Sequence, residues 1–513
     1  EGMSPHAIDL ILNPSASHFA FGKFDVRKRL VIEGSRAFGV SYVYSNLLGN
    51  EAGRIIYDGG ALIASAGRLL AVGPRFSFQP VGLTTTVIDV DATRMSRART
   101  GSFQPDLTDH KETTVSCDFT YPDLEPEVAT PQQADWETGV HVKEEEFTRA
   151  VALGLFDYLR KSRSCGFVVS LSGGADSSAG SCLVALMVEL ASAELGAEGF
   201  RKALGHVPAL GEAGDVKDRV RRLLHCVYQA TKNSSRSTRD CATSLAAALG
   251  AEMSCVEIDE LVEGYVSRME AVLGRKLTWG ADDLALQNIQ ARVRGPSVWL
   301  LANVKRALLL ATSNRSEAAV GYATMDGDTC GGLSPIGGID KAFLRCWLRW
   351  LETEGPAGLH PIPALAAVNR LAPTAELRPQ SAKQTDEDDL MPYEVLDAIE
   401  RAAIRDKQTP VEVLRLMRSR FRQYEVAQLH QWVERFFKLW CRNQWKRERY
   451  APSFHLDDEN LDPKTWCRFP ILSGNFDREL DELGKYVESL QAGPATNHPS
   501  EGKGAPRSGK TEP

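Results

Sequence analysis

Apolar and polar positions follow different patterns in the two parts of this chain, and the change falls near residue 144. Before that point, short apolar runs are separated by Gly, Asn and Asp turn signals, and one longer stretch is amphipathic. The runs cover residues 8–12, 40–44, 61–64, 69–72 and 86–90, and the amphipathic stretch covers residues 24–38. This pattern predicts part of an α/β sandwich-like domain over residues 1–95, followed by a linker over residues 96–143.

From residue 144 the pattern predicts buried strands that alternate with helices. Strands are expected over residues 166–171, 224–228, 255–258 and 307–311, and helices over residues 146–162, 179–190, 238–249 and 283–300, the last interrupted at Gly295-Pro296. Alternation of this kind favours an α/β fold with a doubly wound, mostly parallel sheet, in which ligands bind beyond the carboxyl ends of the strands. The domain is assigned residues 144–490, with a charged helical region at 391–445, and the tail 491–513 lacks the apolar content to fold.

Charge and cysteine usage narrow the possible functions. The net charge of −7 comes from 60 Lys and Arg against 67 Asp and Glu, without a long basic block, so no broad nucleic-acid surface is expected. Ten cysteines are scattered without a CxxC pair, which indicates reduced thiols and a cytoplasmic protein. No basic leader or 18-residue apolar span is evident, and so neither secretion nor membrane insertion is expected.

A glycine loop follows the predicted strand 166–171. Its sequence, SGGADSS at residues 172–178, lets backbone N–H groups surround an anion at the start of a helix. Asp176 would repel a phosphate unless a divalent cation lay between them, which predicts Mg²⁺ bound to a polyphosphate. An ordinary strand-to-helix turn is the alternative. The expected ATP contacts are Ser170, Leu171, Ser172, Gly173, Gly174, Ala175, Asp176 and Ser177.

A second glycine motif is interpreted as coincidence. GAPRSGKT at residues 504–511 satisfies the P-loop pattern, but it follows no strand and precedes no helix. The loop at 172–178 has no lysine and resembles the PP-loop of enzymes that split ATP between the α and β phosphates. Those enzymes, of the adenine nucleotide alpha hydrolase-like fold, activate a carbonyl or carboxylate oxygen by adenylation.

Four further blocks make the resemblance more specific. They are TKNSSRST at 231–238, LQNIQAR at 286–292, ATSNRSE at 311–317 with GYATMDGD at 321–328, and APTAEL at 372–377. Together they resemble the synthetase domain of glutamine-dependent NAD⁺ synthetases over about residues 144–470. The resemblance implies adenylation of the nicotinate carboxylate of deamido-NAD⁺ by ATP, followed by displacement of AMP by ammonia.

The resemblance also implies roles for individual residues. Thr312 and Thr374 match ATP contacts, and Asp176 and Glu317 match the two carboxylates on Mg²⁺. The matching deamido-NAD⁺ contacts are Asn288, Arg292, Glu317, Tyr322, Asp328, Lys341 and Lys446.

The residues themselves agree in part with these roles. Asn288 and Arg292 are four apart and therefore share one helix face, although a solvent-exposed face is the alternative. For Thr312 and Glu317 the alternative is a helix cap with a solvated acid, for Lys341 a surface lysine, and for Lys446 a basic helix end. The glycine-rich stretch 331–338 is expected to be flexible and to close over substrate.

The first 95 residues resemble the later half of a nitrilase-type glutaminase domain. The matching runs are LILNPSASHFAFGK at 10–23, RKR at 27–29, YVYSN at 42–46 and YDGG at 57–60. Ser17 and Lys23 match glutamine-binding positions, but no cysteine precedes Cys117, and so the family's Cys, Glu and Lys are all expected to be absent. Either the sequence begins inside a longer chain, which the mid-domain start favours, or the glutaminase domain is degenerate. Unpaired strand edges are expected here.

Several rival functions share only part of this pattern. A GMP- or asparagine-forming amidotransferase, or a tRNA-thiolating enzyme, would share residues 172–178 but should lack the later blocks. A non-catalytic nucleotide-binding protein is disfavoured because Asp176 and Glu317 are both present. The partners expected are ATP, deamido-NAD⁺, and glutamine or ammonia, with a homo-oligomer as the assembly.

Overall fold

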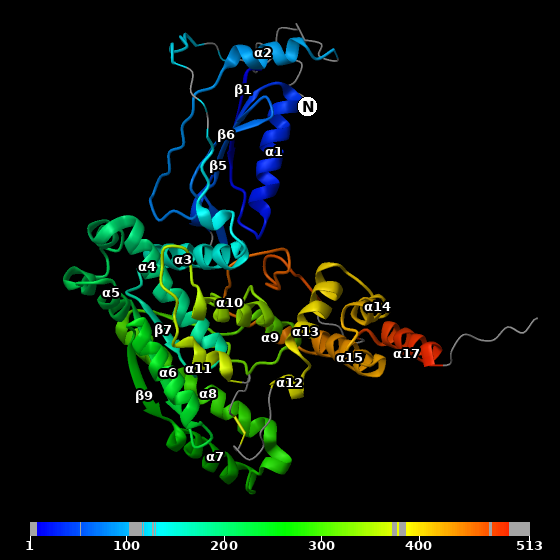
Figure 1. Cartoon of the computed structure of the whole chain (residues 1–513). Helices are drawn as coiled ribbons and strands as arrows, with labels where there is room; N and C mark the ends of the chain where they lie inside the picture. The colour runs from blue at the N-terminus through cyan, green and yellow to red at the C-terminus, as the bar shows by residue number, and fades with distance from the viewer. Residues whose placement is uncertain are drawn as a thin grey trace, which may run out of the picture.

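The structure is a computed structural model that describes residues 8–51, 53–101, 115, 117–125, 128, 130–371, 377–378, 386–470 and 475–491. Its N-terminal part lies at the top of Figure 1, above the larger remainder of the chain. The elements of this part are β1 (Leu10–Ser15), α1 (Lys23–Phe38), β2 (Ser41–Asn46), β3 (Leu48–Glu51), β4 (Ile55–Asp58), β5 (Ala61–Ser65), β6 (Arg68–Val72) and α2 (Val90–Ala98).

A small mixed sheet with α1 on one face forms this N-terminal part. The strand order is β1-β2-β5-β6, with β1 and β2 parallel and the other neighbours antiparallel. Phe24 and Val31 of α1 pack on Tyr44 and Leu62 of the sheet. The strand β1 lies at the edge, and its Leu12 is 67% exposed, which agrees with the expected open strand edge.

The apolar run at residues 86–90 does not form a strand. Its last residue instead begins α2, because Asp89 caps that helix by accepting a hydrogen bond from the Ala92 N–H. The hairpin of β3 and β4 was not expected from the apolar runs. Much of the linker assigned to residues 96–143 and the whole tail from residue 492 lie outside the described residues. The domain boundaries at 95, 143 and 490 stay predictions.

A four-stranded parallel sheet, with order β10-β7-β8-β9, forms the centre of the larger part. This sheet confirms the predicted α/β, doubly wound arrangement. Its elements and the helices around it are η2 (Asp135–Glu137), α3 (Val142–Ser162), β7 (Phe167–Ser170), α4 (Ala175–Ala203), η3 (Pro208–Glu212), α5 (Val216–Leu223), β8 (Leu224–Ala230), α6 (Arg236–Leu249), β9 (Glu252–Glu257), α7 (Asp259–Leu273), α8 (Trp279–Lys305), β10 (Leu308–Leu310), α9 (Arg315–Val320), α10 (Lys341–Thr353) and α11 (Leu365–Arg370).

Helix α8 differs from the prediction because it continues through Gly295 and Pro296. A proline inside a helix removes one backbone hydrogen bond, which is why an interruption was expected. Val293 and Val298 are buried on either side of Pro296 and anchor both turns. The one non-helical residue inside α8 is Asp282, near its start.

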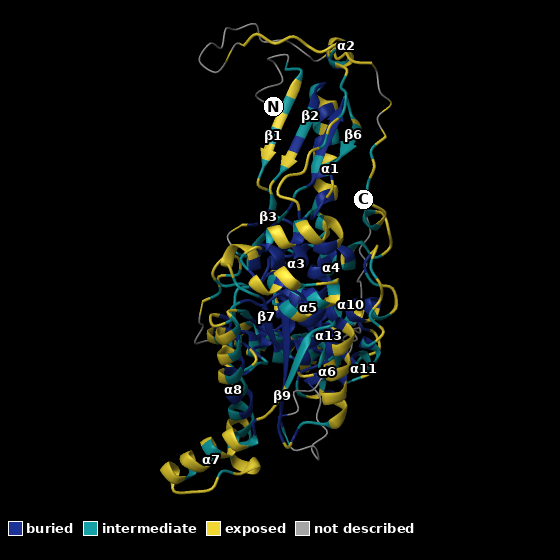
Figure 2. Cartoon of the chain, turned by 90° about the vertical axis from the view of Figure 1, so that its left-hand side faces the viewer, coloured by how far each residue is buried: buried dark blue, intermediate teal, exposed yellow. Residues whose placement is uncertain are grey.

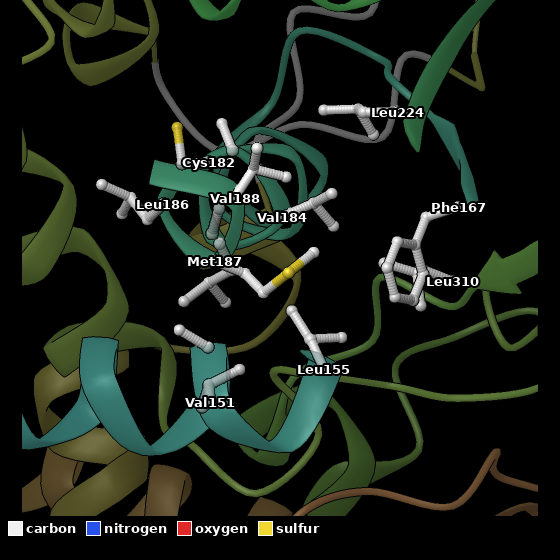
Figure 3. Packing of buried hydrophobic residues seen from close by; sticks show 14 of the residues in the cluster. Val151, Leu155, Phe167, Cys182, Val184, Leu186, Met187, Val188, Leu224 and Leu310 are labelled. Carbon is white, nitrogen blue, oxygen red and sulfur yellow. The ribbon is translucent and has the colours of Figure 1, made fainter. Parts of the chain in front are cut away.

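Helix α4 runs through the main hydrophobic core. Its residues Val184 and Met187 lie between Val151 and Leu155 of α3 and the strand residue Phe167 (Figure 3). By length and composition α4 could also cross a membrane, so the expectation that the chain has no such apolar span is wrong. However, 72% of its most apolar 18-residue window is buried inside the protein.

The N-terminal part belongs to the same core. Phe19, Ile56, Phe76 and Phe78 all join the cluster built on α3 and α4. The Arg75 guanidinium is buried at this junction, where it contacts Glu146 of α3 at 2.6 Å and Asp58 of β4 at 3.4 Å.

A separate helical cluster follows the sheet. Its helices are α12 (Asp386–Asp389), α13 (Tyr393–Glu400), a π-helical turn at Arg401–Arg405, α14 (Pro410–Arg420), α15 (Val426–Arg442), α16 (Gln444–Arg447) and α17 (Asp477–Gln491). This confirms the expected helical region. In Figure 2 the strand β7 lies in the buried centre, whereas α7 is largely exposed at the opposite end from the N-terminal sheet.

Candidate active site

The loop after β7 has the form that the glycine motif predicts. The Ser177 hydroxyl accepts a hydrogen bond from the Ser172 N–H at 3.1 Å, and the two hydroxyls lie 3.0 Å apart. Gly173 has φ +86°, and a Cβ there would lie 2.3 Å from the Thr238 carbonyl oxygen, so this position requires glycine. The loop therefore leaves the first turn of α4 facing open space.

That open space is a cavity of about 610 Å³ beyond the carboxyl ends of β7 and β10. Most of the residues predicted from the sequence line it together. These are Ser170, Ser172, Gly174, Ala175, Asp176, Ser177, Asn288, Arg292, Thr312, Glu317, Tyr322, Asp328, Lys341 and Lys446. Leu171 and Gly173 are buried and are not part of the lining, and Thr374 lies outside the described residues.

Lys341 joins two carboxylates at the centre of the cavity. Its ammonium group donates to Asp176 and, at 3.2 Å, to Glu317. Its side chain is only 4% exposed, which rules out the surface-lysine alternative. Burial lowers the pKa of Lys341, but the charges of Asp176 and Glu317 outweigh burial and raise it. The ammonium group therefore stays charged between the two carboxylates.

Asn314 fixes this arrangement from the start of α9. Its side-chain oxygen accepts from the Glu317 N–H at 3.0 Å, and its amide donates to Asp176 at 3.0 Å. Asn314 is thus the helix cap, and Thr312 is not. Asn314 was not predicted from the sequence, although an Asn immediately before a helix is a capping signal.

Burial changes the protonation of the acids in this cavity. It raises the pKa of Glu317 to about 8, although the Lys341 charge opposes the change. Burial likewise raises the pKa of Asp386 to about 6. Asp386 also lines the cavity and was not predicted. Among the described residues, no group of three His, Cys, Asp or Glu side chains is arranged around a metal position. Asp176 and Glu317 both contact the same cation, Lys341.

A second wall of the cavity comes from α8 and the loop at residues 321–328. Asn288 accepts a hydrogen bond from the Thr324 hydroxyl at 2.8 Å, and Arg292 donates to the Met325 carbonyl oxygen at 3.0 Å. Asp328 accepts from the Thr324 N–H at 2.7 Å, and burial raises its pKa. Asn288 and Arg292 therefore share the cavity-facing side of α8, as their spacing predicts.

Lys446 and Tyr322 also line the cavity, beside the loop at residues 321–328. The Lys446 ammonium donates to the carbonyl oxygens of Gly321 at 2.7 Å and Ala323 at 3.0 Å. The Tyr322 hydroxyl donates to Asp389 at 2.9 Å, and Asp389 also lines the cavity. Lys446 is thus tied to the 321–328 loop and is not a free basic helix end.

The stretch at residues 331–338 is not the flexible lid that its glycines suggested. The Gly332 N–H donates to the Leu309 carbonyl oxygen at 2.8 Å, and the Ala311 N–H donates to that of Leu333 at 2.9 Å. A Cβ on Gly331 would lie 2.4 Å from the Ala311 nitrogen. These glycines therefore permit close packing beside β10, and most of the stretch is buried.

The two predicted glutamine-binding residues lie in the N-terminal part, Ser17 on the segment between β1 and α1 and Lys23 at the first position of α1. The Ser17 N–H donates to Asn46 at 2.9 Å, and Arg27 donates to the Ser17 hydroxyl at 3.1 Å. The Lys23 ammonium lies 3.0 Å from the His18 ring, and burial lowers the Lys23 pKa. The segment is therefore held in place by Arg27 and Asn46.

Comparisons with known proteins place this fold in one family. A model of the NAD synthase family matches residues 147–448. The glutamine-dependent NAD(+) synthetase of Oryza sativa subsp. indica is 30% identical over 522 residues, which covers 95% of this chain and 70% of that protein. The corresponding protein of Homo sapiens is 30% identical over 498 residues, which covers 90% of this chain and 68% of that protein.

A solved structure gives the same result. The glutamine-dependent NAD(+) synthetase from Cytophaga hutchinsonii is 42% identical in sequence, and its structure matches this one with a TM-score of 0.73. The match covers 93% of this chain and 70% of that one. The parallel sheet, glycine loop and cavity define an α/β enzyme fold of the PP-loop type. The chain belongs to the family of glutamine-dependent NAD(+) synthetases, ligases of NAD biosynthesis. The resemblance drawn from the sequence motifs is thereby confirmed.

Proposed function

We propose that this chain catalyses the ATP-dependent conversion of deamido-NAD⁺ to NAD⁺, with release of AMP and diphosphate. The observation that carries the proposal is the single cavity that joins the glycine loop to the side chains of Asn288, Arg292 and Asp328. One end offers backbone donors and a helix N-terminus for phosphates. The other offers an amide, a guanidinium and a carboxylate for a second nucleotide.

The reaction needs two substitutions. In the first, a carboxylate oxygen of the nicotinate attacks the α-phosphorus of ATP, the bond to the β-phosphate oxygen breaks, and diphosphate leaves. In the second, ammonia attacks the resulting acyl carbon, the bond to AMP breaks, and the nitrogen loses a proton. Both substitutions depend on positioning and on neutralising negative charge, which Lys341 is placed to do beside the loop.

Asp176 and Glu317 fit Mg²⁺, because Mg²⁺ is usually held by one or two carboxylates together with substrate phosphates. When bound, the ion would neutralise phosphate charge. Asn314 keeps Asp176 oriented for this role through its 3.0 Å hydrogen bond. Lys341 would then turn from the carboxylates towards the phosphates.

The nitrogen source follows from the N-terminal part. No cysteine occurs among residues 1–95, although the nitrilase-type glutaminases that this part resembles use a cysteine thiolate. Ser17 and Lys23 can contact glutamine but cannot hydrolyse it. We therefore propose that the cavity accepts free ammonia, and that the glutamine-dependent reaction requires a cysteine thiolate from outside residues 1–95.

The test is NAD⁺ formation from deamido-NAD⁺, ATP and Mg²⁺, run with ammonium chloride and separately with glutamine. Product with ammonium alone is the expected result, and Asp176→Asn should lower that rate by about 100-fold or more. Arg422→Gln, an exposed change in the helical cluster, is the control. Absence of product with either nitrogen source, from protein that still binds ATP, would refute the choice of substrate.

We also propose a cytoplasmic homo-oligomer. All ten cysteines are described, and they are present as free thiols, which suits a reducing compartment. Helix α7 has no buried residue and exposes Leu261, Tyr265 and Val272. An apolar face of this kind on a globular protein suits an interface with a second copy. Light scattering after gel filtration should give a mass of at least twice 56.3 kDa.

A further inference from the structure

Three cationic side chains form a row along α10. Lys341, Arg345 and Arg349 follow one another at intervals of four residues, which places them on one helix face, and all three line the cavity. At a rise of 1.5 Å per residue, the row extends about 12 Å outward from the glycine loop. Like charges four residues apart destabilise a helix, so this spacing is unfavourable for α10 itself.

The three cations have fewer carboxylate partners the farther they lie from the glycine loop. Lys341 is buried against Asp176 and Glu317. Arg345 is 31% exposed and lies 3.4 Å from Glu387. Arg349 is exposed, its recorded side-chain contact is with the Cys346 sulfur at 3.2 Å, and no carboxylate among the described residues pairs with it. Its guanidinium is therefore available to an anion from the cavity.

The chemistry of the row suits a polyphosphate. Guanidinium groups bind phosphate oxygens through two parallel N–H donors, and they keep their charge throughout the physiological pH range. The proposed reaction produces one such anion, inorganic diphosphate, at the inner end of the row beside Lys341. Carboxylates neutralised by Lys341 at the inner end, and at the outer end a guanidinium without a carboxylate partner in the described part of the chain, would favour movement of that anion towards solvent.

We propose that Arg345 and Arg349 bind the diphosphate product and lead it from Lys341 to the mouth of the cavity. This inference rests on the proposed function and adds to it a route for product release. No covalent bond changes in this step, because the diphosphate has already been released by cleavage of the ATP α–β linkage. Both arginines act on the product and not on the reacting carboxylate.

Calorimetric titration with inorganic diphosphate tests the row directly, without turnover. We expect the double variant Arg345→Gln with Arg349→Gln to bind diphosphate at least about tenfold more weakly, which corresponds to about 1.4 kcal/mol. Arg349→Lys should recover only part of the loss, since it restores the charge but not the paired donors. Arg422→Gln should bind as the wild type does. Circular dichroism establishes that each variant is folded.

Steady-state kinetics give a second readout. In the double variant, the inhibition constant of diphosphate should rise by the same factor, whereas KM for deamido-NAD⁺ should stay within twofold of the wild-type value. If the double variant still forms NAD⁺ and binds diphosphate as tightly as the wild type, the proposed role of Arg345 and Arg349 is refuted. An equal loss of diphosphate affinity in Arg422→Gln would refute it as well. If the double variant binds diphosphate more weakly than the wild type does, but the wild type itself forms no NAD⁺, the result would support diphosphate binding by the row and refute the proposed reaction.

Discussion

Arg315 provides the sharpest test of the electrostatic structure behind the cavity. Its guanidinium is 1% exposed and donates to Glu459 at 2.7 Å, to Asp457 at 3.1 Å and to Asp340 at 3.2 Å. Its Nε also lies 3.2 Å from Glu400. Four carboxylates from three segments of the chain therefore surround one buried cation, and of these Glu459 also contacts Arg401 at 2.6 Å and Arg405 at 3.0 Å.

Arg315→Met removes that cation while keeping an apolar side chain in its place. Loss of one partner from a buried ion pair costs about 3–5 kcal/mol, because the remaining charge is left unpaired in the interior. We expect a decrease in the free energy of unfolding of that size at pH 7. Urea denaturation followed by tryptophan fluorescence would measure it. We also expect lower activity, because Arg315 lies between Thr312 and Glu317, which line the cavity.

The penalty should also depend on pH. Burial already raises the pKa of Glu400 to about 8 although Arg315 opposes the change, and without Arg315 the folded-state pKa of Glu400 should rise further. The variant's native state would then bind one proton more at Glu400 than its unfolded state, so its free energy of unfolding should rise as the pH falls from 8 to 5.

Arg405→Met is the matched control. Arg405 contacts Glu459 at 3.0 Å but is 33% exposed, so its loss should cost about 1 kcal/mol or less. A stability of Arg315→Met within 1 kcal/mol of the wild type across this pH range would refute the argument. Equal losses in Arg315→Met and Arg405→Met would refute it as well.

Three further predictions concern the cavity itself. Gly331→Ala should lose about 1–3 kcal/mol of stability by unfolding assay, because its Cβ would meet the Ala311 nitrogen at 2.4 Å, whereas Gly332→Ala, with 3.9 Å to its nearest neighbour, should behave as wild type. Asn314→Ala should cost about 1 kcal/mol as a lost cap, and Asn314→Ser should regain that stability without regaining ATP affinity; wild-type ATP affinity in Asn314→Ser would contradict the positioning of Asp176. The affinity for Mg²⁺ should rise as the pH increases towards 8, where Glu317 loses its proton, and the Glu317→Gln variant should show a flat profile.

Much of the site could be predicted from the sequence because its residues cluster in short blocks at the ends of strands. The SGGADSS run after β7 and the ATSNRSE run after β10 lie at the same edge of the sheet, since neighbouring parallel strands end on one side. Asn288 and Arg292 were chosen from the family resemblance, and their helical spacing placed them on one face of a helix. These signals are local, and so a linear reading was sufficient to find them.

The parts that the sequence could not reveal depend on contacts between distant segments. Glycines at 331–338 predict flexibility unless one knows that Ala311 lies against them. The partners of Lys341, at residues 176 and 317, are far away in the chain, and its burial could not be inferred from its neighbours. Likewise, Pro296 suggests a helix break from the sequence alone, because the burial of Val293 and Val298 on either side of it cannot be seen there.

The shared core of the N-terminal part and α3 limits how this protein can be divided. Phe76 and Phe78 pack into the same cluster as Phe147 and Phe156 of α3. An isolated fragment that began at residue 130 would expose the rings of Phe147 and Phe156 to water, although it would keep all the residues that line the cavity. Such a fragment should be catalytically complete yet prone to aggregation, so gene fusion and fission between the two parts would require new surface residues along α3.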